Sequence, residues 1–332
     1  MSENKFNCVV LLGPTAAGKT SLGVRLASHF GWEIVSADSR QVYKGLDLGS
    51  GKDLCDYTLI KKNPDGSEVE EKIPYHLIDV ATLDEEYNCY HFQSDFYFLF
   101  NEFKTQNKMP FVVGGTGMYL DSIVRGYDFM PVEENKKLRC ELEKKSLEEL
   151  DEILLNLKPN LHNKSDLLIR ERVVRAIEIE LYMQSPECAE ERKKRPCRSK
   201  INSFVIGTSL EREVLRQNIK IRLEQRMNDG MLEEVENLHK SGYSWERLEK
   251  LGLEYRYLSL YLEGKIQSRE EMLFSLYHAI TQFAKRQETW FRGMEKKGVK
   301  IHWLTKENDS QKKYSEAVSL IEENLFLQDA KD

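Results

Sequence analysis

The sequence predicts an α/β fold in which a parallel sheet is flanked by helices and an all-helical domain is inserted into the chain. Three observations predict this fold. Short apolar segments alternate with helix-like segments over the first 125 residues, and a glycine-rich loop follows the first apolar segment. Strand-like segments are missing between about residues 126 and 200, where charged helical stretches replace them. Continuous apolar strands separated by helices are typical of a parallel sheet covered on both faces.

The strand predictions rest on short runs that are rich in apolar and β-branched residues. In SLGVRLASHF, by contrast, the apolar residues Leu22, Leu26 and Ala27 fall on one side of a helix. We therefore predict one core from residues 1–125 and 201–332, with residues 126–200 as a helical insertion domain. The predicted strands are Cys8–Leu12, Glu33–Ala37, His76–Val80, Pro110–Gly115 and Phe204–Leu210.

The composition is that of a globular protein. Of the 332 residues, 40% are hydrophobic and 31% charged, and the net charge is −6. No apolar run approaches the ~18 residues that a helix needs to cross a bilayer. The six cysteines form no CxxC pair, which argues against a zinc site or a disulfide framework. We expect a reduced, cytoplasmic protein that acts as a monomer.

Residues 13–20, GPTAAGKT, match the pattern G-x-x-x-x-G-K-[ST] in full, between a predicted strand and a predicted helix. In such a loop, backbone N–H groups turn toward an anion and the helix N-terminus adds partial positive charge. Lys19 supplies a point charge, and the Thr20 hydroxyl is placed to bind Mg²⁺. The pattern is typical of nucleotide-binding and ATP-binding proteins, so the predicted core is P-loop NTPase-like. The candidate phosphate-binding residues are Gly13, Pro14, Thr15, Ala16, Ala17, Gly18, Lys19 and Thr20.

Asp38 directly follows the second predicted strand, at the sheet edge where open α/β folds bind ligands. Three roles are open to this carboxylate: it binds Mg²⁺, caps a helix, or accepts a proton from a substrate. Enzymes that hydrolyse ATP at a P-loop use an aspartate at a strand end to position the metal. Only Asp79, in HLIDV, matches that pattern here, which weakens the case for ATP hydrolysis.

Two further patterns have both a functional and a structural interpretation. The loop GGTG at residues 114–117 allows close approach of a ligand and places Thr116 beside it, yet glycines after a strand are also common in turns. Arg222 and Arg226 lie one turn apart on a predicted helix. They form either a diphosphate clamp or a solvated face with glutamate partners.

Two later segments are candidates for contact with RNA. The segment RKKRPCRSK, residues 192–200, has six basic residues and no acidic one, although charge alone favours a solvated linker. Residues 272–294 are strongly amphipathic. We expect their apolar side to include Leu276, Ala279, Ile280, Phe283, Gln287 and Trp290, and their polar side His278, Gln282, Lys285, Thr289 and Arg292. A local basic surface attracts phosphate even when the net charge is negative.

Taken together, these stretches resemble the tRNA dimethylallyltransferase (tRNA isopentenyltransferase) family. The resemblance implies transfer of a dimethylallyl group from dimethylallyl diphosphate to N6 of adenosine 37 in the anticodon loop of tRNA, with release of diphosphate. It also implies a P-loop-type core with a helical insertion that grips the anticodon arm. The matching segments follow the family's order from about residue 8 to residue 304: GPTAAGKT, SADSRQVYKGLDLG, YHLIDV, FVVGGTGMYL, RVVRAIEI, RLEQRM and AKRQETWFR.

The resemblance further implies roles for individual residues. Residues 13–20 hold the diphosphate and its Mg²⁺, and Asp38 is the base that faces the adenine amino group. Thr116 lies near the reacting centre, and Arg226 binds the diphosphate. With the resemblance added, the basic segment 192–200 is favoured as an RNA contact. The other implied tRNA contacts are Asp38, Ser39, Arg40, Gln41, Arg172, Arg175, Gln282, Lys285 and Arg286.

The chain departs from the family pattern in three places. Gly49–Asp53 reads GSGKD where the family usually has GTAKP. Gly252–Tyr257 reads GLEYRY in place of a GYKE-like turn, and Thr281 replaces an expected arginine.

Three alternative functions remain open from the sequence. An adenylate isopentenyltransferase uses the same donor on free AMP or ADP, and needs neither the helical insertion nor the basic segment. A small-molecule kinase uses ATP at the same loop. A non-catalytic tRNA-binding protein retains the fold, although the presence of Lys19, Thr20 and Asp38 argues against it.

Overall fold

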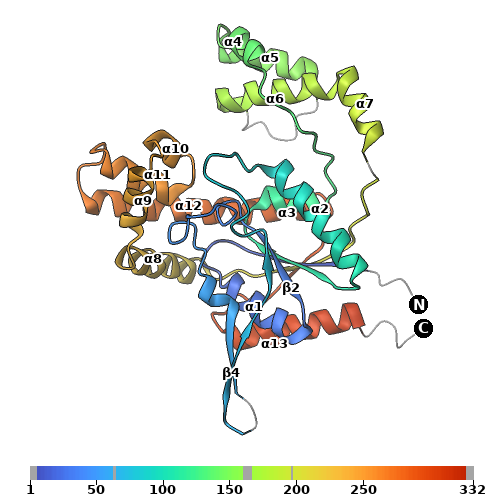
Figure 1. The fold of residues 1–332 in the computed structure, drawn as a ribbon, viewed down its shortest axis with the longest axis vertical. Helices are drawn as coiled ribbons and strands as arrows, with labels where there is room; N and C mark the ends of the chain where they lie inside the picture. Colours follow the sequence, from blue (N-terminus) through green and yellow to red (C-terminus); the bar gives the residue numbers. More distant parts are fainter. Residues whose placement is uncertain (1–5, 63–64, 160–166, 196, 327–332) are drawn as a thin grey trace. The chain divides into compact units, whose positions relative to one another are not determined.

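The computed structural model describes residues 6–62, 65–159, 167–195 and 197–326 (Figure 1). The chain divides into two compact units. The core unit comprises Met1–Tyr127 and Ser199–Asp332, and the helical unit comprises Asp128–Arg198. The helical unit therefore lies inside the segment 126–200 for which the sequence predicts an insertion.

The core unit is built on a six-stranded parallel sheet with the order β5-β2-β6-β1-β7-β8. β1 pairs with β6 on one side and β7 on the other, which places the first strand in the middle of the sheet. The parallel sheet flanked by helices confirms the predicted fold class. The strands are β1 (Cys8–Leu12), β2 (Glu33–Ala37), β5 (Tyr75–His76), β6 (Pro110–Gly114), β7 (Ser203–Gly207) and β8 (Ile301–Trp303).

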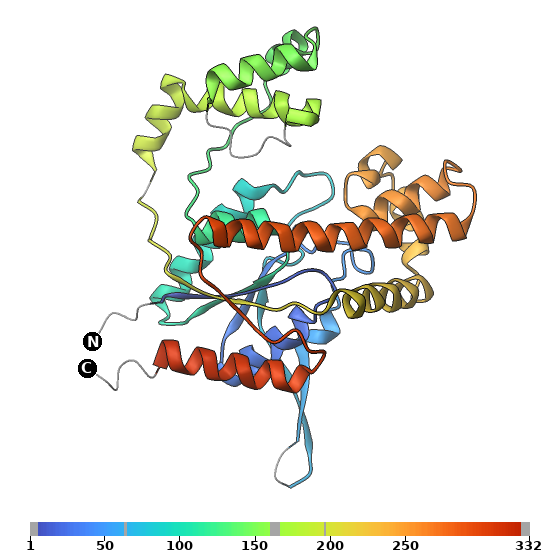
Figure 2. The ribbon, with the colours of Figure 1, turned by 180° about the vertical axis from the view of Figure 1, so that it is seen from behind.

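Helices cover both faces of the sheet. Because side chains alternate along a strand, Val9 and Leu11 pack on one face, and Cys8, Val10 and Leu12 pack on the other. Figure 2 shows α12 and α13 on opposite sides of the strands. The first face is covered by α1 (Lys19–Phe30) and α13 (Ser310–Ile321), and the second by α2 (Cys89–Thr105), α3 (Gly117–Val124) and the C-terminal half of α12 (Arg269–Lys296).

A helical subassembly extends the core unit beyond the sheet. The N-terminal half of α12 contributes Met272, Leu276 and Ile280 to its apolar cluster. The loop after β2 joins the same cluster through Val42, Tyr43 and Leu46. The other helices of the subassembly are α8 (Arg212–Asn228), α9 (Met231–Lys240), α10 (Trp245–Glu249) and α11 (Leu253–Leu262).

The helical unit has a small apolar core of its own, formed by Leu142, Leu150, Leu154, Val173 and Ile177. Most of its helices start at a capping side chain, such as Ser146, which forms a capping box with Glu149 at the start of α5. The helices in its described residues are α4 (Lys136–Leu142), α5 (Leu147–Leu157), α6 (Arg170–Met183) and α7 (Pro186–Lys194).

The prediction of a strand over His76–Val80 is wrong beyond its first residue. β5 ends at His76, because Leu77 and Asp79 adopt φ angles of 60° and 55°, in the left-handed region. Asp79 then turns toward Lys52, with which it forms an ion pair. The predictions over Pro110–Gly115 and Phe204–Leu210 are correct in place but extend past the strand ends at Gly114 and Gly207.

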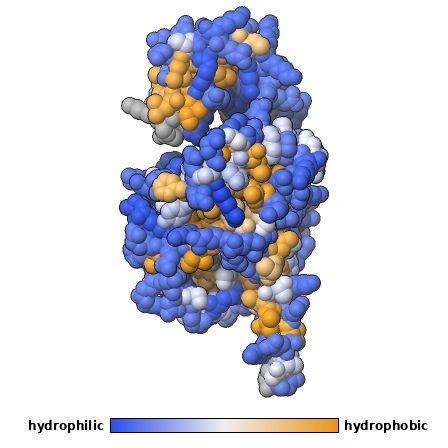
Figure 3. Space-filling model, turned by 90° about the vertical axis from the view of Figure 1, so that its left-hand side faces the viewer, coloured by the Kyte–Doolittle hydropathy of each residue, from blue (hydrophilic) through white to orange (hydrophobic). Residues whose placement is uncertain are grey.

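The sequence did not predict an antiparallel hairpin formed by β3 (Thr58–Lys62) and β4 (Glu68–Lys72). A short 3₁₀ helix, η1 (Leu54–Tyr57), leads into it. Figure 3 shows apolar surface on this hairpin, where Ile60 and Val69 are 65% and 49% exposed. The described part of the chain ends with η3 (Glu322–Phe326), which continues from α13. Among the residues that the structure describes, every helix is too short or too polar to cross a membrane.

Candidate functional site

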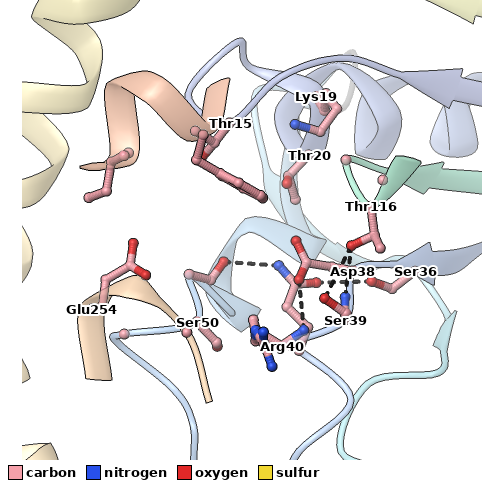
Figure 4. A pocket seen from close by; sticks show the side chains of 18 of the residues that line it. Thr15, Lys19, Thr20, Ser36, Asp38, Ser39, Arg40, Ser50, Thr116 and Glu254 are labelled. Carbon is pink, nitrogen blue, oxygen red and sulfur yellow. Dashed lines mark hydrogen bonds between the residues drawn. The ribbon is translucent and has the colours of Figure 1, made fainter. Parts of the chain in front are cut away.

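Three motifs predicted from the sequence meet at one edge of the sheet. The glycine-rich loop follows β1, Asp38 follows β2 and Gly115 follows β6, so parallel pairing brings them to the same side. They line a cavity of about 190 Å³ (Figure 4). Its lining includes Thr15, Lys19, Thr20, Asp38, Ser39, Arg40, Gln41, Thr116, Arg222, Arg226, Glu254 and Gln287.

The glycine-rich loop has the backbone of an anion-binding nest. Ala16 and Gly18 have φ angles of 60° and 78°, which turn successive peptide groups toward one side. Gly13 is required for another reason, since a Cβ atom there would lie 2.2 Å from the carbonyl oxygen of Thr208 at the end of β7. The loop ends at Lys19, where α1 begins and adds its N-terminal partial charge.

Lys19 is partly buried, and its Nζ donates to the carbonyl oxygen of Pro14 at 2.6 Å. Burial, and then the nearby Arg222, lower the pKa of this ammonium to about 8, while Asp38 opposes the shift. An anion that enters the cavity therefore interacts favourably with Lys19 and stabilises its charged form.

Arg222 and Arg226 both face the cavity from α8, so the alternative of a solvated face with glutamate partners is wrong. Arg222 donates to the Thr15 hydroxyl of the glycine-rich loop. Burial, and then the nearby Arg226, lower the pKa of Arg222 to about 10. Arg226 is only 7% exposed and forms an ion pair with Asp53, with 3.0 Å between Nη2 and Oδ2.

The turn after β2 holds Asp38 in place. Its Oδ1 accepts from the backbone N–H of Arg40 at 2.9 Å. The N–H of Ser39, between these two residues, donates to Thr116 Oγ1 at 3.0 Å. Within the described part of the chain Asp38 caps no helix, and no hydrogen bond engages its second oxygen. Figure 4 shows this carboxylate beside Thr20 and Thr116. Of the three roles considered for Asp38, metal binding and proton transfer remain.

The sequence analysis does not assign Gln287 to the site. It expects Gln287 on the apolar side of α12, where the residue is buried. Its Oε1 accepts from the N–H of Thr15, and its Nε2 donates to the carbonyl oxygen of Gly115, both at 2.8 Å. Gln287 thus joins the loops after β1 and β6. An amide on an otherwise apolar helix face was the signal available in the sequence.

The sequence analysis also missed Glu254 and Glu234. Glu254 lies in the first turn of α11 and lines the cavity, where burial raises its pKa against the opposing effect of Arg226 and Arg222. Figure 4 shows it across the cavity from Asp38. Glu234 accepts backbone N–H groups of Asp47, Leu48 and Gly49 at 2.7–3.1 Å and the hydroxyl of Tyr255 at 2.8 Å. It holds the loop that forms one wall of the cavity.

The candidate tRNA contacts fall in several places. Ser39, Arg40 and Gln41 line the cavity. Gln282 and Lys285 line a second, basic pocket between α8 and α12, together with Arg212, Arg216 and Arg292. Arg286 is exposed, with its guanidinium 5.9 Å from the ring centroid of Phe283.

Arg172 and Arg175 belong to the helical unit. Arg175 contacts Glu178 at 3.0 Å and donates to the carbonyl oxygen of Val132 at 2.6 Å, so it stabilises that unit.

The basic segment 192–200 is partly neutralised. Arg192 and Arg195 lie 3.2 and 4.0 Å from the carboxylate of Asp128, and Lys193 lies 2.7 Å from Glu190. Lys194 is exposed and makes no ion pair within the described residues. Pro196, in the same segment, lies outside those residues.

Few protein groups in the site are suited to a metal ion. Across the described ranges, no three His, Cys, Asp or Glu side chains are grouped as a metal site. The Thr20 hydroxyl and the Asp38 carboxylate line the same cavity. Such a sparse oxygen set fits Mg²⁺, which keeps several waters and takes further ligands from substrate phosphates.

Comparison with known proteins agrees with this arrangement. The family model described as IPP transferase matches residues 41–294, and the one described as isopentenyl transferase matches residues 6–58. The tRNA dimethylallyltransferase 2 of Treponema denticola is 52% identical over 305 residues, which cover 92% of this chain and 97% of that protein. The tRNA dimethylallyltransferase 2 of Bacteroides fragilis is 44% identical, covering 98% of this chain and 99% of that protein.

Solved structures have the same fold. The full-length tRNA isopentenylpyrophosphate transferase of Bacillus halodurans superposes with a TM-score of 0.65 at 28% identity, covering 96% of each chain. A eukaryotic dimethylallyltransferase acting on tRNA superposes with a TM-score of 0.73 over 98% of this chain and 80% of that one, at 23% identity. The breadth of these matches and the convergence of the three motifs on one cavity lead to one conclusion: this chain belongs to the IPP transferase family.

Proposed function

We infer that this protein is a tRNA dimethylallyltransferase, which transfers the dimethylallyl group of dimethylallyl diphosphate to N6 of adenosine 37 in the anticodon loop of tRNA. The observation that carries the inference is the composition of the cavity. A phosphate-binding loop and two arginines line it together with a carboxylate whose second oxygen has no hydrogen-bond partner among the described residues. Relatives named for this activity support the choice of donor and acceptor.

The cationic side of the cavity suits a departing diphosphate. When an allylic C–O bond breaks, negative charge accumulates on the diphosphate while positive charge spreads over the allyl carbons. Lys19, Arg222 and Arg226 are already in place around the cavity, so they bind the growing anion better than the ground state. Removal of one such donor typically costs about 3 kcal/mol of barrier.

Mg²⁺ is part of the proposal. The residue that would hold it is Thr20, with the diphosphate and water supplying further oxygens. When bound, the ion would neutralise charge on the diphosphate and strengthen its leaving ability.

Asp38 is suited to activate the acceptor. The adenine amino group is a poor nucleophile, because its lone pair is delocalised into the ring. Asp38 gains a proton from this group as the new C–N bond forms, and the turn that holds its Oδ1 fixes the direction of Oδ2. The base must leave the anticodon-loop stack to reach this carboxylate.

The test of the proposal compares two acceptors, tRNA and AMP. The protein is incubated with dimethylallyl diphosphate and either tRNA or AMP, and the nucleosides are analysed by mass. A dimethylallyl adduct on tRNA only is expected. An adduct on AMP only would identify an adenylate isopentenyltransferase, ATP consumption without an adduct would identify a kinase, and tRNA binding without an adduct would leave a non-catalytic binding protein.

The role of Asp38 has its own test. We expect Asp38→Ala to lower the rate of transfer by about 10² to 10⁴, the usual contribution of a general base, while inorganic pyrophosphate still binds. Binding is measured by calorimetry and transfer by single-turnover kinetics. Full transfer activity in this variant would remove Asp38 from the mechanism.

A further inference from the structure

Two of the positions at which the chain departs from the family pattern lie against one guanidinium. Gly51 and Asp53 belong to GSGKD, which stands where the family usually has GTAKP. Arg226, 173 residues away from Asp53 in the chain, donates from Nη2 to Asp53 Oδ2 at 3.0 Å. Arg226 reaches this position from α8 and lines the cavity at the same time.

The guanidinium occupies the space that a side chain at position 51 would fill. A Cβ atom on Gly51 would lie 2.5 Å from Arg226 Nη2 and 2.9 Å from Nη1. Gly51 also has a φ angle of 72°, which disfavours alanine independently of space. The alanine of GTAKP is therefore incompatible with Arg226 in this position.

Position 53 acts on the same side chain. The proline of GTAKP has no group to accept from an arginine, whereas the Asp53 carboxylate offsets the charge of Arg226. This matters because Arg222 lies beside Arg226: burial is the larger cause of the lowered pKa of Arg222, and the like charge of Arg226 adds to it. A carboxylate partner also fixes the plane of a guanidinium, because the pairing is directional.

We propose that Asp53 is a positioning residue: together with Gly51 it fixes Arg226 in the orientation that receives the diphosphate before the donor arrives. This proposal rests on the proposed function for the identity of the donor. The proposal explains the residues at positions 51 and 53 together: Gly51 leaves space for the Arg226 guanidinium, and Asp53 holds it there.

The test separates donor binding from tRNA binding. We expect Asp53→Ala to raise the KM for dimethylallyl diphosphate and the Kd for inorganic pyrophosphate by about tenfold or more, as is usual when a hydrogen bond to a charged group is lost. The KM for tRNA should stay within about twofold of the wild type, since neither Asp53 nor Arg226 is among the candidate tRNA contacts. Asp53→Asn, which keeps an acceptor without the charge, should give a smaller effect, and Gly51→Ala an effect in the same direction as Asp53→Ala.

A double-mutant cycle shows whether Asp53 acts through Arg226. In an Arg226→Gln background, Asp53→Ala should have almost no further effect on pyrophosphate binding. Asp84→Asn is the control, because Asp84 is exposed, makes no ion pair within the described residues and does not line the cavity. Thermal melting shows that each variant is folded.

Three results would overturn the proposal. They are an unchanged Kd for pyrophosphate in Asp53→Ala, an equal loss in the Asp84→Asn control, and an undiminished effect of Asp53→Ala in the Arg226→Gln background. Pyrophosphate binding does not require tRNA or transfer, so these results are distinguishable from a failure of the proposed function.

Discussion

Lys19 makes anion binding in the cavity depend on pH. Its pKa is lowered to about 8 by burial and by Arg222, so the ammonium begins to lose its proton near that pH in the free protein. A bound diphosphate favours the charged form and raises this pKa again. Above pH 8, binding must therefore be accompanied by uptake of a proton.

We predict that the affinity for inorganic pyrophosphate falls by up to about tenfold per pH unit above pH 8, relative to a Lys19→Arg variant whose guanidinium stays charged. The Kd is measured by calorimetry between pH 7 and pH 9.5 for both proteins. The comparison with the variant removes the titration of pyrophosphate itself. Equal pH profiles for the two proteins would show that Lys19 is not the titrating group.

At the scale of single residues, the sequence predicts site residues that act through their own turn. It misses those that act through partners far away in the chain. Residues 13–20 and Asp38 were identified because each functions through the turn in which it lies. Gln287 and Asp53 act through partners that are 272 and 173 residues away, Thr15 and Arg226. No pattern within a short window contains such pairs, so a buried glutamine and a departure from GTAKP were the only hints.

Among the elements, α9 holds a loop of the cavity wall, a role that its sequence does not indicate. Glu234, in its first turn, accepts three backbone N–H groups from the loop at residues 47–49 as well as the Tyr255 hydroxyl. It thereby connects the loop after β2 to the helical subassembly. Unsatisfied N–H groups in a partly buried loop are costly, so this carboxylate determines whether that wall of the cavity is ordered.

We predict that Glu234→Ala lowers the free energy of unfolding by about 2–4 kcal/mol, because several charge-assisted hydrogen bonds are lost and their donors stay buried. Glu236→Ala is the matched control on the same helix, since Glu236 is 47% exposed and, among the residues that the structure describes, pairs with Lys240 alone, one turn away. That change should cost less than about 0.5 kcal/mol. Denaturant unfolding measures both, and equal costs would contradict the role assigned to Glu234.

The strands show why element boundaries are harder to predict than element types. HLIDV has a strand-like composition, yet β5 ends at His76 because Asp79 leaves the sheet to pair with Lys52. The hairpin of β3 and β4 was missed for the opposite reason. Its sequences, TLIKK and EVEEK, are too charged to signal a buried strand, and they pair with each other outside the main sheet.

At the scale of the whole molecule, the net charge of −6 and the binding of an anionic acceptor are reconciled by local sorting of charge. The core unit gathers cations in the cavity and in the pocket between α8 and α12. In the helical unit, several arginines that the sequence assigned to tRNA are engaged by carboxylates, such as Glu178 and Asp128. These arginines maintain the fold of the unit, which leaves lysines as its better candidates for contact with phosphate.

The last prediction concerns the lysines at the end of α7, because the nearby arginines are paired with a carboxylate. Neutralising Arg192 and Arg195 would also remove the pairs with Asp128, so the effect on tRNA would be mixed with an effect on stability. Lys193 and Lys194 are exposed at the end of α7, and Lys193 pairs with Glu190, which is itself exposed. We therefore predict that the double change Lys193→Gln and Lys194→Gln weakens tRNA binding and leaves the melting temperature unchanged.

The dependence on salt distinguishes contact with phosphate from other causes. Each phosphate contact that is lost should reduce the slope of log K against log salt by about 0.7–0.9, whereas the affinity for pyrophosphate should not change. Lys312→Gln is a control on the core unit, because Lys312 is also exposed and pairs with Glu307. Filter binding to tRNA between 50 and 200 mM salt measures the slopes, in the range where phosphate contacts have large effects. If the double variant and the control have the same slope as the wild type, the end of α7 is a solvated surface, and the cations that hold the anticodon arm must be sought on the core unit.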